Sequence, residues 1–169
     1  IVDTVVEIMR SFSGFLSYAR ADLALVQTFV GLMGSRLLTR PGFKASLWND
    51  AHILVGQGWE REIDRALENA DFGVLCVSAS LMASPYIQRV ELPSLLSPER
   101  IVVPFALEPI DHLDLGPLAG LQIFRLRTPG GTRWLSFQEA RRTHPQRFCD
   151  ELLAQLGQRL LGGEGLGGA

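Results

Sequence analysis

The sequence predicts an α/β fold of the flavodoxin-like type, a doubly wound five-stranded parallel sheet with helices on both faces. Two observations lead to this prediction. Short, almost fully apolar runs alternate along the chain with longer segments whose apolar residues recur at helical spacing. Strands that are apolar throughout indicate a sheet covered on both faces, which is typical of parallel sheets. The chain has 169 residues, 47% of them hydrophobic, which suits one ordinary domain with a substantial core.

Five segments have the character of buried strands. The clearest is FGVLCVS at residues 72–78, which is apolar along nearly its whole length. The other four are GFLSYA at 14–19, KASLW at 44–48, RIVVPFAL at 100–107 and LQIFRL at 121–126. Ligands bind outside the carboxyl ends of the strands in open parallel sheets. A functional site is therefore expected in the loops that follow these five segments.

Four helices are expected between and after the strands. The first follows Asp22, which is placed to cap it, and ends before a Pro-Gly pair. The second covers residues 59–70, where Trp59, Ile63 and Leu67 share one face. The third covers about residues 86–96 and the last covers residues 148–161, again with apolar residues at helical spacing.

The composition disfavours several classes of protein. A net charge of −2 argues against a protein that coats nucleic acid. No run approaches the roughly 20 apolar residues that a bilayer requires, so no contact with a membrane is expected. Cys76 and Cys149 fall in a predicted strand and a predicted helix, which is no disulfide framework. These features favour a cytoplasmic location.

The chain divides into three parts. Residues 1–13 form an N-terminal extension, residues 14–161 the domain, and residues 162–169 (GGEGLGGA) a glycine-rich linker or tail. The chain begins with Ile1 instead of methionine, so we expect it to be a piece of a longer protein. The tail would then lead to another domain, with a natural terminus or an engineered remnant as alternatives.

Most common catalytic motifs are absent from the sequence. There is no GxGxxG after the first predicted strand, no GxxxxGK[ST] and no GxSxG. The three histidines, His52, His112 and His144, lie far apart without a second ligand at helical spacing, so no metal site is expected. Dinucleotide-fold dehydrogenases, P-loop enzymes and α/β-hydrolases are therefore disfavoured.

Three of the loops at the predicted carboxyl ends carry the remaining polar and aromatic residues. The first is FLSYARAD at residues 15–22. In the second, Asp50 follows a strand and GQGW at residues 56–59 enters a helix. The third is SASLMASPYIQRVEL at residues 78–92. In this order and spacing the three segments resemble the Toll/interleukin-1 receptor (TIR) domain family, particularly its bacterial NAD⁺-cleaving branch. The resemblance covers roughly residues 14–127.

The resemblance implies hydrolysis of the nicotinamide–ribose bond of NAD⁺, which gives nicotinamide and ADP-ribose or a cyclised ADP-ribose. Glu91 matches the catalytic glutamate of the family. Nicotinamide leaves as a neutral molecule and needs no general acid, so one carboxylate that stabilises an oxocarbenium-like transition state suffices. The alternative interpretation of Glu91 is a solvated acid in the first turns of a helix, where it favours the dipole. NAD⁺ is the substrate and no further cofactor is expected.

The resemblance also implies which residues contact the substrate. These are Phe15, Ser17, Tyr18, Arg20, Asp50, Tyr86 and Ile87. Arg20 is expected to bind the pyrophosphate, Asp50 to hold the following loop through Gly58, and Tyr86 to form a wall for a planar ring. Catalytic members often have an aromatic residue one turn before the glutamate, where this chain has Ile87. Trp59 is expected to be a core residue.

The loop after the second strand is expected to mediate association between TIR domains. Its candidate contact residues are Ile53, Leu54, Val55, Gly56 and Gly58, with Val55 in place of the usual proline.

The resulting hypothesis is a NAD⁺ glycohydrolase that is activated by self-association. It would act in bacterial antiphage defence, with a sensor domain in the same chain and no direct contact with nucleic acid. The alternatives are a non-catalytic TIR–TIR interaction module and an enzyme resembling nucleoside deoxyribosyltransferases.

Overall fold

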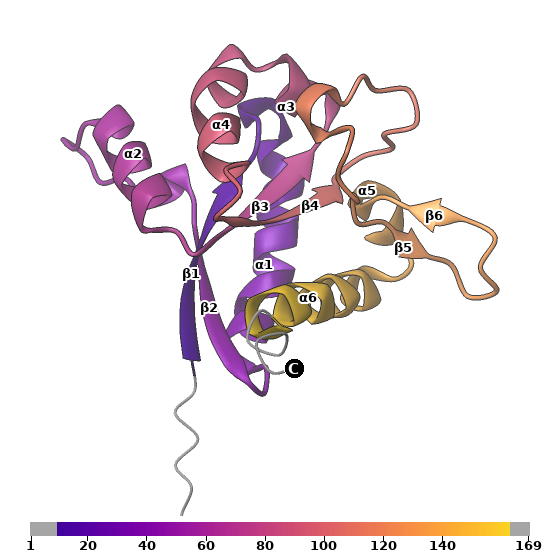
Figure 1. The fold of residues 1–169 in the computed structure, drawn as a ribbon. Coiled ribbons are helices and arrows are strands. Elements are labelled where there is room, and N and C mark those ends of the chain that lie inside the picture. The colour runs from indigo at the N-terminus through magenta and orange to yellow at the C-terminus, as the bar shows by residue number, and fades with distance from the viewer. Residues whose placement is uncertain (1–9, 163–169) are drawn as a thin grey trace, which may run out of the picture.

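The computed structural model describes residues 10–162, which form an α/β domain around one parallel sheet (Figure 1). Its strands are β1 (Arg10–Ser17), β2 (Phe43–Trp48), β3 (Phe72–Val77) and β4 (Ile101–Ala106). They are ordered β2-β1-β3-β4 and every neighbouring pair is parallel. The predicted doubly wound α/β class is confirmed. Most of the predicted glycine-rich tail and residues 1–9 lie outside the described residues.

The fifth predicted strand is reduced to a single bridge. Of residues 121–126 only Phe124 pairs with the sheet, in parallel with Phe105. Its N–H donates to the Pro104 carbonyl and its carbonyl accepts from Ala106 N–H, both at 2.9 Å. Pro104 has no N–H, so the outer edge of β4 has one donor fewer for a longer ladder. The chain instead turns into a short antiparallel hairpin of β5 (Leu126–Arg127) and β6 (Trp134–Leu135).

Strand β1 begins four residues before the predicted start. Its first half pairs only with β2, whereas pairing with β3 begins at Gly14. The polar residues Arg10, Ser11 and Ser13 are therefore exposed, while Gly14 to Ser17 are buried. The apolar run that begins at Gly14 therefore predicted only the buried half of the strand.

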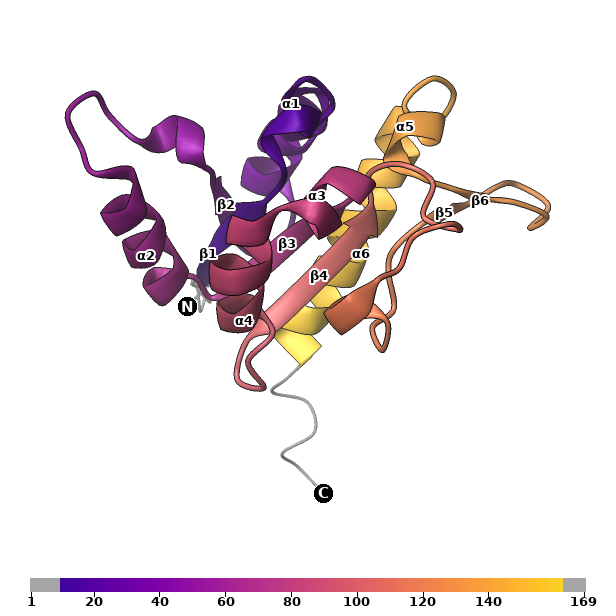
Figure 2. The same cartoon turned by 90° about the horizontal axis from the view of Figure 1, so that it is seen from above.

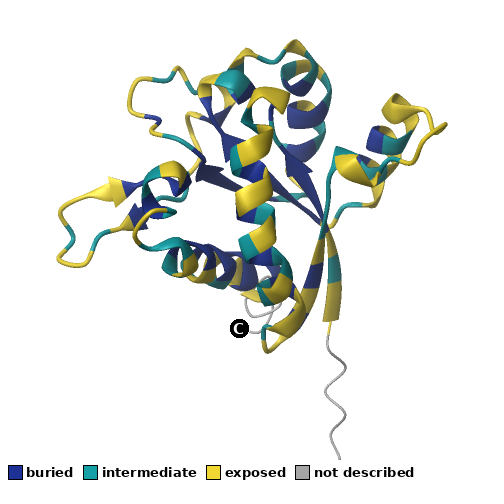
Figure 3. Ribbon diagram, turned by 180° about the vertical axis from the view of Figure 1, so that it is seen from behind, coloured by how far each residue is buried: buried dark blue, intermediate teal, exposed yellow. Residues whose placement is uncertain are grey.

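Helices cover both faces of the sheet, as predicted (Figure 2). One face carries α1 (Leu23–Thr39), the short α5 (Phe137–Ala140) and α6 (Pro145–Leu161). The other carries α2 (Trp59–Asn69), α3 (Ala79–Ala83) and α4 (Leu92–Leu95). Each face has its own core, and the buried positions concentrate on the sheet and on the inner sides of these helices (Figure 3).

Helix α1 follows Asp22, but the carboxylate of this residue does not cap it. It accepts a hydrogen bond of 2.5 Å from the Ser78 hydroxyl instead, because the end of β3 lies beside the start of α1. Residues 20–39 form one helix of the described chain that is long and apolar enough, by length and composition, to cross a membrane. In the fold its apolar side packs on the sheet through Val26, Phe29 and Met33.

The close packing of β1 against β3 makes a first prediction. A Cβ added at Gly14 would lie 2.3 Å from Cζ of Phe72 and 2.9 Å from Cδ2 of Leu47. We expect Gly14→Ala to lower the free energy of unfolding by about 2 kcal/mol, measured by urea denaturation. The matched control is Gly34→Ala in α1, where a Cβ meets nothing within 4 Å. That change should stabilise by about 0.5–1 kcal/mol through helix propensity. Equal effects of the two substitutions would contradict the packing argument.

Candidate active site

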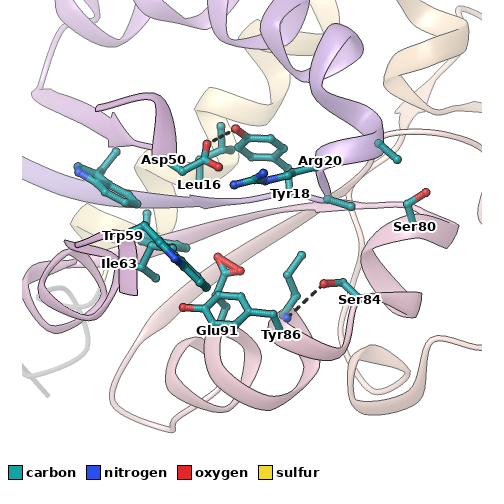
Figure 4. A pocket seen from close by; sticks show the side chains of 15 residues that line it. Leu16, Tyr18, Arg20, Asp50, Trp59, Ile63, Ser80, Ser84, Tyr86 and Glu91 are labelled. Atoms are coloured by element: carbon teal, nitrogen blue, oxygen red, sulfur yellow. Dashed lines mark hydrogen bonds between the residues drawn. The ribbon is translucent and has the colours of Figure 1, made fainter. Parts of the chain in front are cut away.

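A cleft of about 590 Å³ opens at the carboxyl ends of β1, β2 and β3 (Figure 4). Its volume is in the range of small-molecule sites. Its walls come from the loops after these strands, from the start of α2 and from the helical segment before α4. It brings together most of the predicted site residues: Phe15, Tyr18, Arg20, Asp50, Tyr86, Ile87 and Glu91. The sheet topology explains this convergence, because parallel strands end at the same edge.

Glu91 lies in the wall of this cleft and is buried, with 7% of its surface exposed. Its carboxyl group points toward the cleft (Figure 4). Among the described residues none donates a hydrogen bond to it. Burial, and then the negative charge of Asp50, raises the pKa of Glu91 from 4.5 to about 7. The residue is therefore not the solvated helix-face acid of the alternative interpretation.

A π-helical turn positions Glu91. The predicted helix over residues 86–96 contains this turn at Ile87–Glu91, directly before α4. The Leu92 N–H donates to the Ile87 carbonyl, five residues back. Pro93 follows and has no N–H, so the regular ladder cannot continue through it. Such turns are rare and often occur at functional sites, since they shift one side chain out of the normal helical register. The Ser84 hydroxyl accepts from Ile87 N–H at 3.4 Å at the start of this segment.

Trp59 and Tyr86 form an aromatic wall beside Glu91. Their ring centroids are 5.3 Å apart and the rings meet edge to face at 61°. The expectation that Trp59 is a core residue is wrong, because half of its surface is exposed. It is the first residue of α2 and packs on Tyr86, which comes from the helical segment before α4 on the same face of the sheet. Burial and nearby acids raise the pKa of Tyr86 to about 12, so its phenol stays neutral at ordinary pH.

Buried apolar side chains form the floor of the cleft. Phe15 is 1% exposed and stacks on Trp48, with ring centroids 5.4 Å apart and an interplanar angle of 20°. Ile87 is also buried. These three side chains keep water from the apolar side of the cleft, so charges in it interact more strongly than in bulk solvent.

The Tyr18 hydroxyl donates a hydrogen bond to Oδ1 of Asp50 and so links the loops that follow β1 and β2. Burial, and then this bond, raises the pKa of Tyr18. The expected hold of Asp50 on the loop through Gly58 is limited to its start, where the Asp50 carbonyl accepts from Ile53 N–H at 3.1 Å. A local capping box orders the same turn: Asn49 Oδ1 accepts from Ala51 N–H at 2.9 Å, and His52 Nδ1 accepts from Asn49 N–H at 3.1 Å.

Ser17 does not line the cleft, although the resemblance placed it there. It is fully buried, and its hydroxyl oxygen has no hydrogen-bond partner among residues 10–162. Ser17 is the last residue of β1 and pairs with Leu75 of β3.

Arg20 is exposed and is the one cation among the described residues that line the cleft. The turn that carries it (Arg20–Asp22) is anchored by the bond from Ser78 to Asp22. Ser78 Oγ also accepts from Leu81 N–H at 3.0 Å and so caps α3. This Ser78–Asp22 anchor was not among the interactions expected from the sequence. An acid after β1 and a serine after β3, on neighbouring strands, were the signal that could have identified it.

The predicted association loop is exposed. Leu54 has 68% of its surface accessible and Val55 is fully exposed, while Ile53 packs partly on the core. The turn is closed by Gln57 N–H, which donates to the Leu54 carbonyl at 3.1 Å. Gly56 has φ = 89° at the third position, as a type II turn requires. Type II turns favour proline at the second position, which Val55 occupies here.

The proximity of Asp50 to Glu91 makes a second prediction. We expect Asp50→Asn to lower the pKa of Glu91 below about 7, because it removes a negative charge without changing the shape of the side chain. The measurement is a ¹³C NMR titration of the Glu91 carboxyl carbon. Asp64→Asn, on the outer part of α2, is the control and should leave this titration unchanged. An unchanged midpoint in Asp50→Asn would show that burial alone sets the pKa.

The cleft thus combines a buried carboxyl group, an aromatic wall and one arginine at the carboxyl edge of a doubly wound sheet. No group of three or more His, Cys, Asp or Glu in the described part of the chain could hold a metal ion. The model of the TIR domain family matches residues 15–153, so the chain belongs to this family. No curated protein matches the chain.

Proposed function

We propose that this TIR domain hydrolyses NAD⁺ at the bond between nicotinamide and ribose. The proposal depends mainly on the position of Glu91. This residue is buried, its carboxyl group has no protein hydrogen-bond partner, and the group points into a cleft large enough for a nucleotide. The Glu91 oxygens are not among the fully buried unpaired atoms of the described residues, so they can be reached from the cleft. A reachable carboxyl group with a perturbed pKa in a cleft is a candidate for a functional site.

The reaction needs few protein groups. The bond between ribose C1′ and the nicotinamide nitrogen breaks, and its electron pair neutralises the pyridinium. Water then adds its oxygen to C1′ and releases a proton, which gives ADP-ribose. Ionised Glu91 would stabilise the positive charge that develops on the ribose and accept hydrogen bonds from its hydroxyls. The cationic nicotinamide ring would favour this ionised form as it enters.

The other residues of the cleft fit parts of the substrate. The faces of Trp59 and Tyr86 suit a cationic ring through cation–π attraction. Arg20, as a planar donor, suits the pyrophosphate. From the resemblance alone we also place this chain in the bacterial NAD⁺-cleaving branch. There it would be a cytoplasmic effector of antiphage defence, with a sensor domain in a longer chain.

The test is the release of nicotinamide from NAD⁺, followed by chromatography over a range of protein concentrations, with and without a crowding agent. Nicotinamide together with ADP-ribose or its cyclised form is the expected result. A deoxynucleoside with a free base as acceptor is offered in parallel and should not react. If no assembled condition releases nicotinamide, the domain is a non-catalytic interaction module. The absence of an aromatic side chain at position 87 supports that second candidate.

Self-association through the exposed loop makes a third prediction. The loop leads directly into Trp59, so a second copy that docks on it would also shape the aromatic wall. We expect Leu54→Ser combined with Val55→Ser to weaken association about tenfold or more in sedimentation velocity, because two exposed apolar side chains are lost. Specific activity should then stop rising with concentration. Leu38→Ser, at an equally exposed position of α1, is the control. An unchanged association constant would exclude this loop from the interface.

A further inference from the structure

A second groove, of about 420 Å³, lies at the outer edge of β4, on the side of the sheet covered by α6. It shares no lining residue with the cleft around Glu91. Its walls are β4, the segment that bridges to it, the β5–β6 hairpin and α6. We call it the arginine groove; its lining residues are Val102, Val103, Pro104, Gln122, Ile123, Phe124, Arg125, Arg127, Trp134, Glu151, Gln155 and Arg159.

Three arginines line the groove, two from the segment around β5 and one from α6, and each has at least one hydrogen-bond partner. Arg159 Nη1 donates to the Val102 carbonyl at 3.2 Å. Nε and Nη2 of Arg127 donate to the Gly131 carbonyl, both at 3.2 Å. Arg125 Nη1 contacts Asp111 at 3.1 Å. A guanidinium has five N–H donors, so these contacts hold the groups in place and leave donors free.

The charge of the groove is not balanced within the protein. In the described part of the chain, Arg127 and Arg159 have no carboxylate partner. The one acid in the lining, Glu151, is paired with Arg147 at 3.0 Å. Like charges that converge in a concave site attract an anion, and planar guanidinium groups bind phosphate with paired hydrogen bonds.

An exposed indole completes the groove. Trp134 has 53% of its surface accessible. The guanidinium carbons of Arg127 and Arg125 lie over its ring, 5.4 Å and 6.0 Å from the ring centroid, as cation–π contacts. A flat aromatic surface beside arginines is how proteins stack nucleobases and hold the adjoining phosphates.

The edge of β4 disfavours a different occupant, an added strand from another chain. Pro104 has no N–H, and its carbonyl already accepts from Phe124 N–H. The Val102 carbonyl is taken by Arg159. The groove thus has few free main-chain groups for a ladder and many side-chain donors for a small anion.

We propose that the arginine groove binds a free mononucleotide, with its phosphates on Arg127 and Arg159 and its base against Trp134. The site is independent of the proposed hydrolysis of NAD⁺. It would give the domain a second nucleotide site on the side away from Glu91.

The test is calorimetric titration of the protein with ADP, which has no nicotinamide–ribose bond and is therefore not a substrate of the proposed hydrolysis. We expect saturable binding that Arg127→Ala combined with Arg159→Ala weakens about tenfold to a hundredfold. Arg127→Ala alone, which keeps the Arg159 contact to β4, should weaken it in the same direction. The control is Arg141→Ala combined with Arg142→Ala, which removes the same charge outside the groove.

Three results would overturn the proposal. The first is the absence of ADP binding. The second is an equal loss of affinity in the groove variant and the control variant, which would indicate unspecific attraction. The third is tighter binding of a single-stranded oligonucleotide than of ADP, with the same dependence on Arg127, which would assign the groove to nucleic acid instead. Thermal melting of each variant establishes that the domain is folded.

Discussion

Glu91→Gln is expected to reduce kcat/KM for NAD⁺ cleavage by about 10²–10³-fold, the size of loss seen when one preorganised charge-stabilising group is removed. The amide keeps the volume of the side chain and its place on the π turn. It cannot carry the negative charge that stabilises an oxocarbenium-like transition state. The measurement is the initial rate of nicotinamide release at several NAD⁺ concentrations, under conditions where the wild type is assembled.

The control for this prediction is Glu99→Gln, which changes an exposed acid outside the cleft. It should retain the wild-type rate. Sedimentation of both variants at the assay concentration separates a loss of chemistry from a loss of assembly. An equally active Glu91→Gln protein would remove the carboxylate from the mechanism and, with it, the proposed function.

The same substitution is expected to stabilise the fold at alkaline pH. The pKa of Glu91 is about 7 in the folded protein, against 4.5 ordinarily, so the folded state holds a proton that the unfolded state has lost between these values. The wild type therefore loses stability as pH rises through this window. The full shift corresponds to about 3 kcal/mol. Gln stays neutral, so Glu91→Gln should be more stable than the wild type by up to about 3 kcal/mol at pH 8 and about equally stable below pH 4.5.

Urea denaturation of both proteins at pH 4, 6 and 8 measures this effect. The quantity compared is the difference in unfolding free energy between variant and wild type. Other groups titrate in both proteins, including Asp22, whose pKa burial also raises. Their contributions cancel in this difference. A difference that does not change with pH would mean that Glu91 is solvated, and would contradict the burial on which the proposed function depends.

Activity and folding stability are expected to change in opposite directions with pH, because both depend on the ionisation of Glu91. If the ionised carboxyl group of Glu91 is the active form, activity should rise with pH through about 7, whereas stability should fall over the window below it. A site that keeps an unpaired acid in an apolar wall gives up stability for a group that a ligand can use.

Much of the architecture could be predicted from local patterns. Apolar runs located all four strands of the main sheet, and helical spacing located α1, α2 and α6 within a few residues. The loops that form the cleft could be predicted from these strands, because the carboxyl ends of parallel strands lie at the same edge of the sheet. The exception was residues 121–126, where the missing N–H of Pro104 and the turn into the hairpin leave only the Phe124 bridge.

The fold class, the family resemblance and the position of Glu91 could be predicted from the sequence, because they depend on residue order and on periodicity along the chain. What surrounds each side chain depends on tertiary contacts, which the sequence pattern does not reveal. The burial of Glu91, the exposure of Trp59 and the bond from Tyr18 to Asp50 all arise between elements distant in sequence. A carboxyl group takes its pKa, and an aromatic ring its exposure, from neighbours that the chain brings together only when it folds.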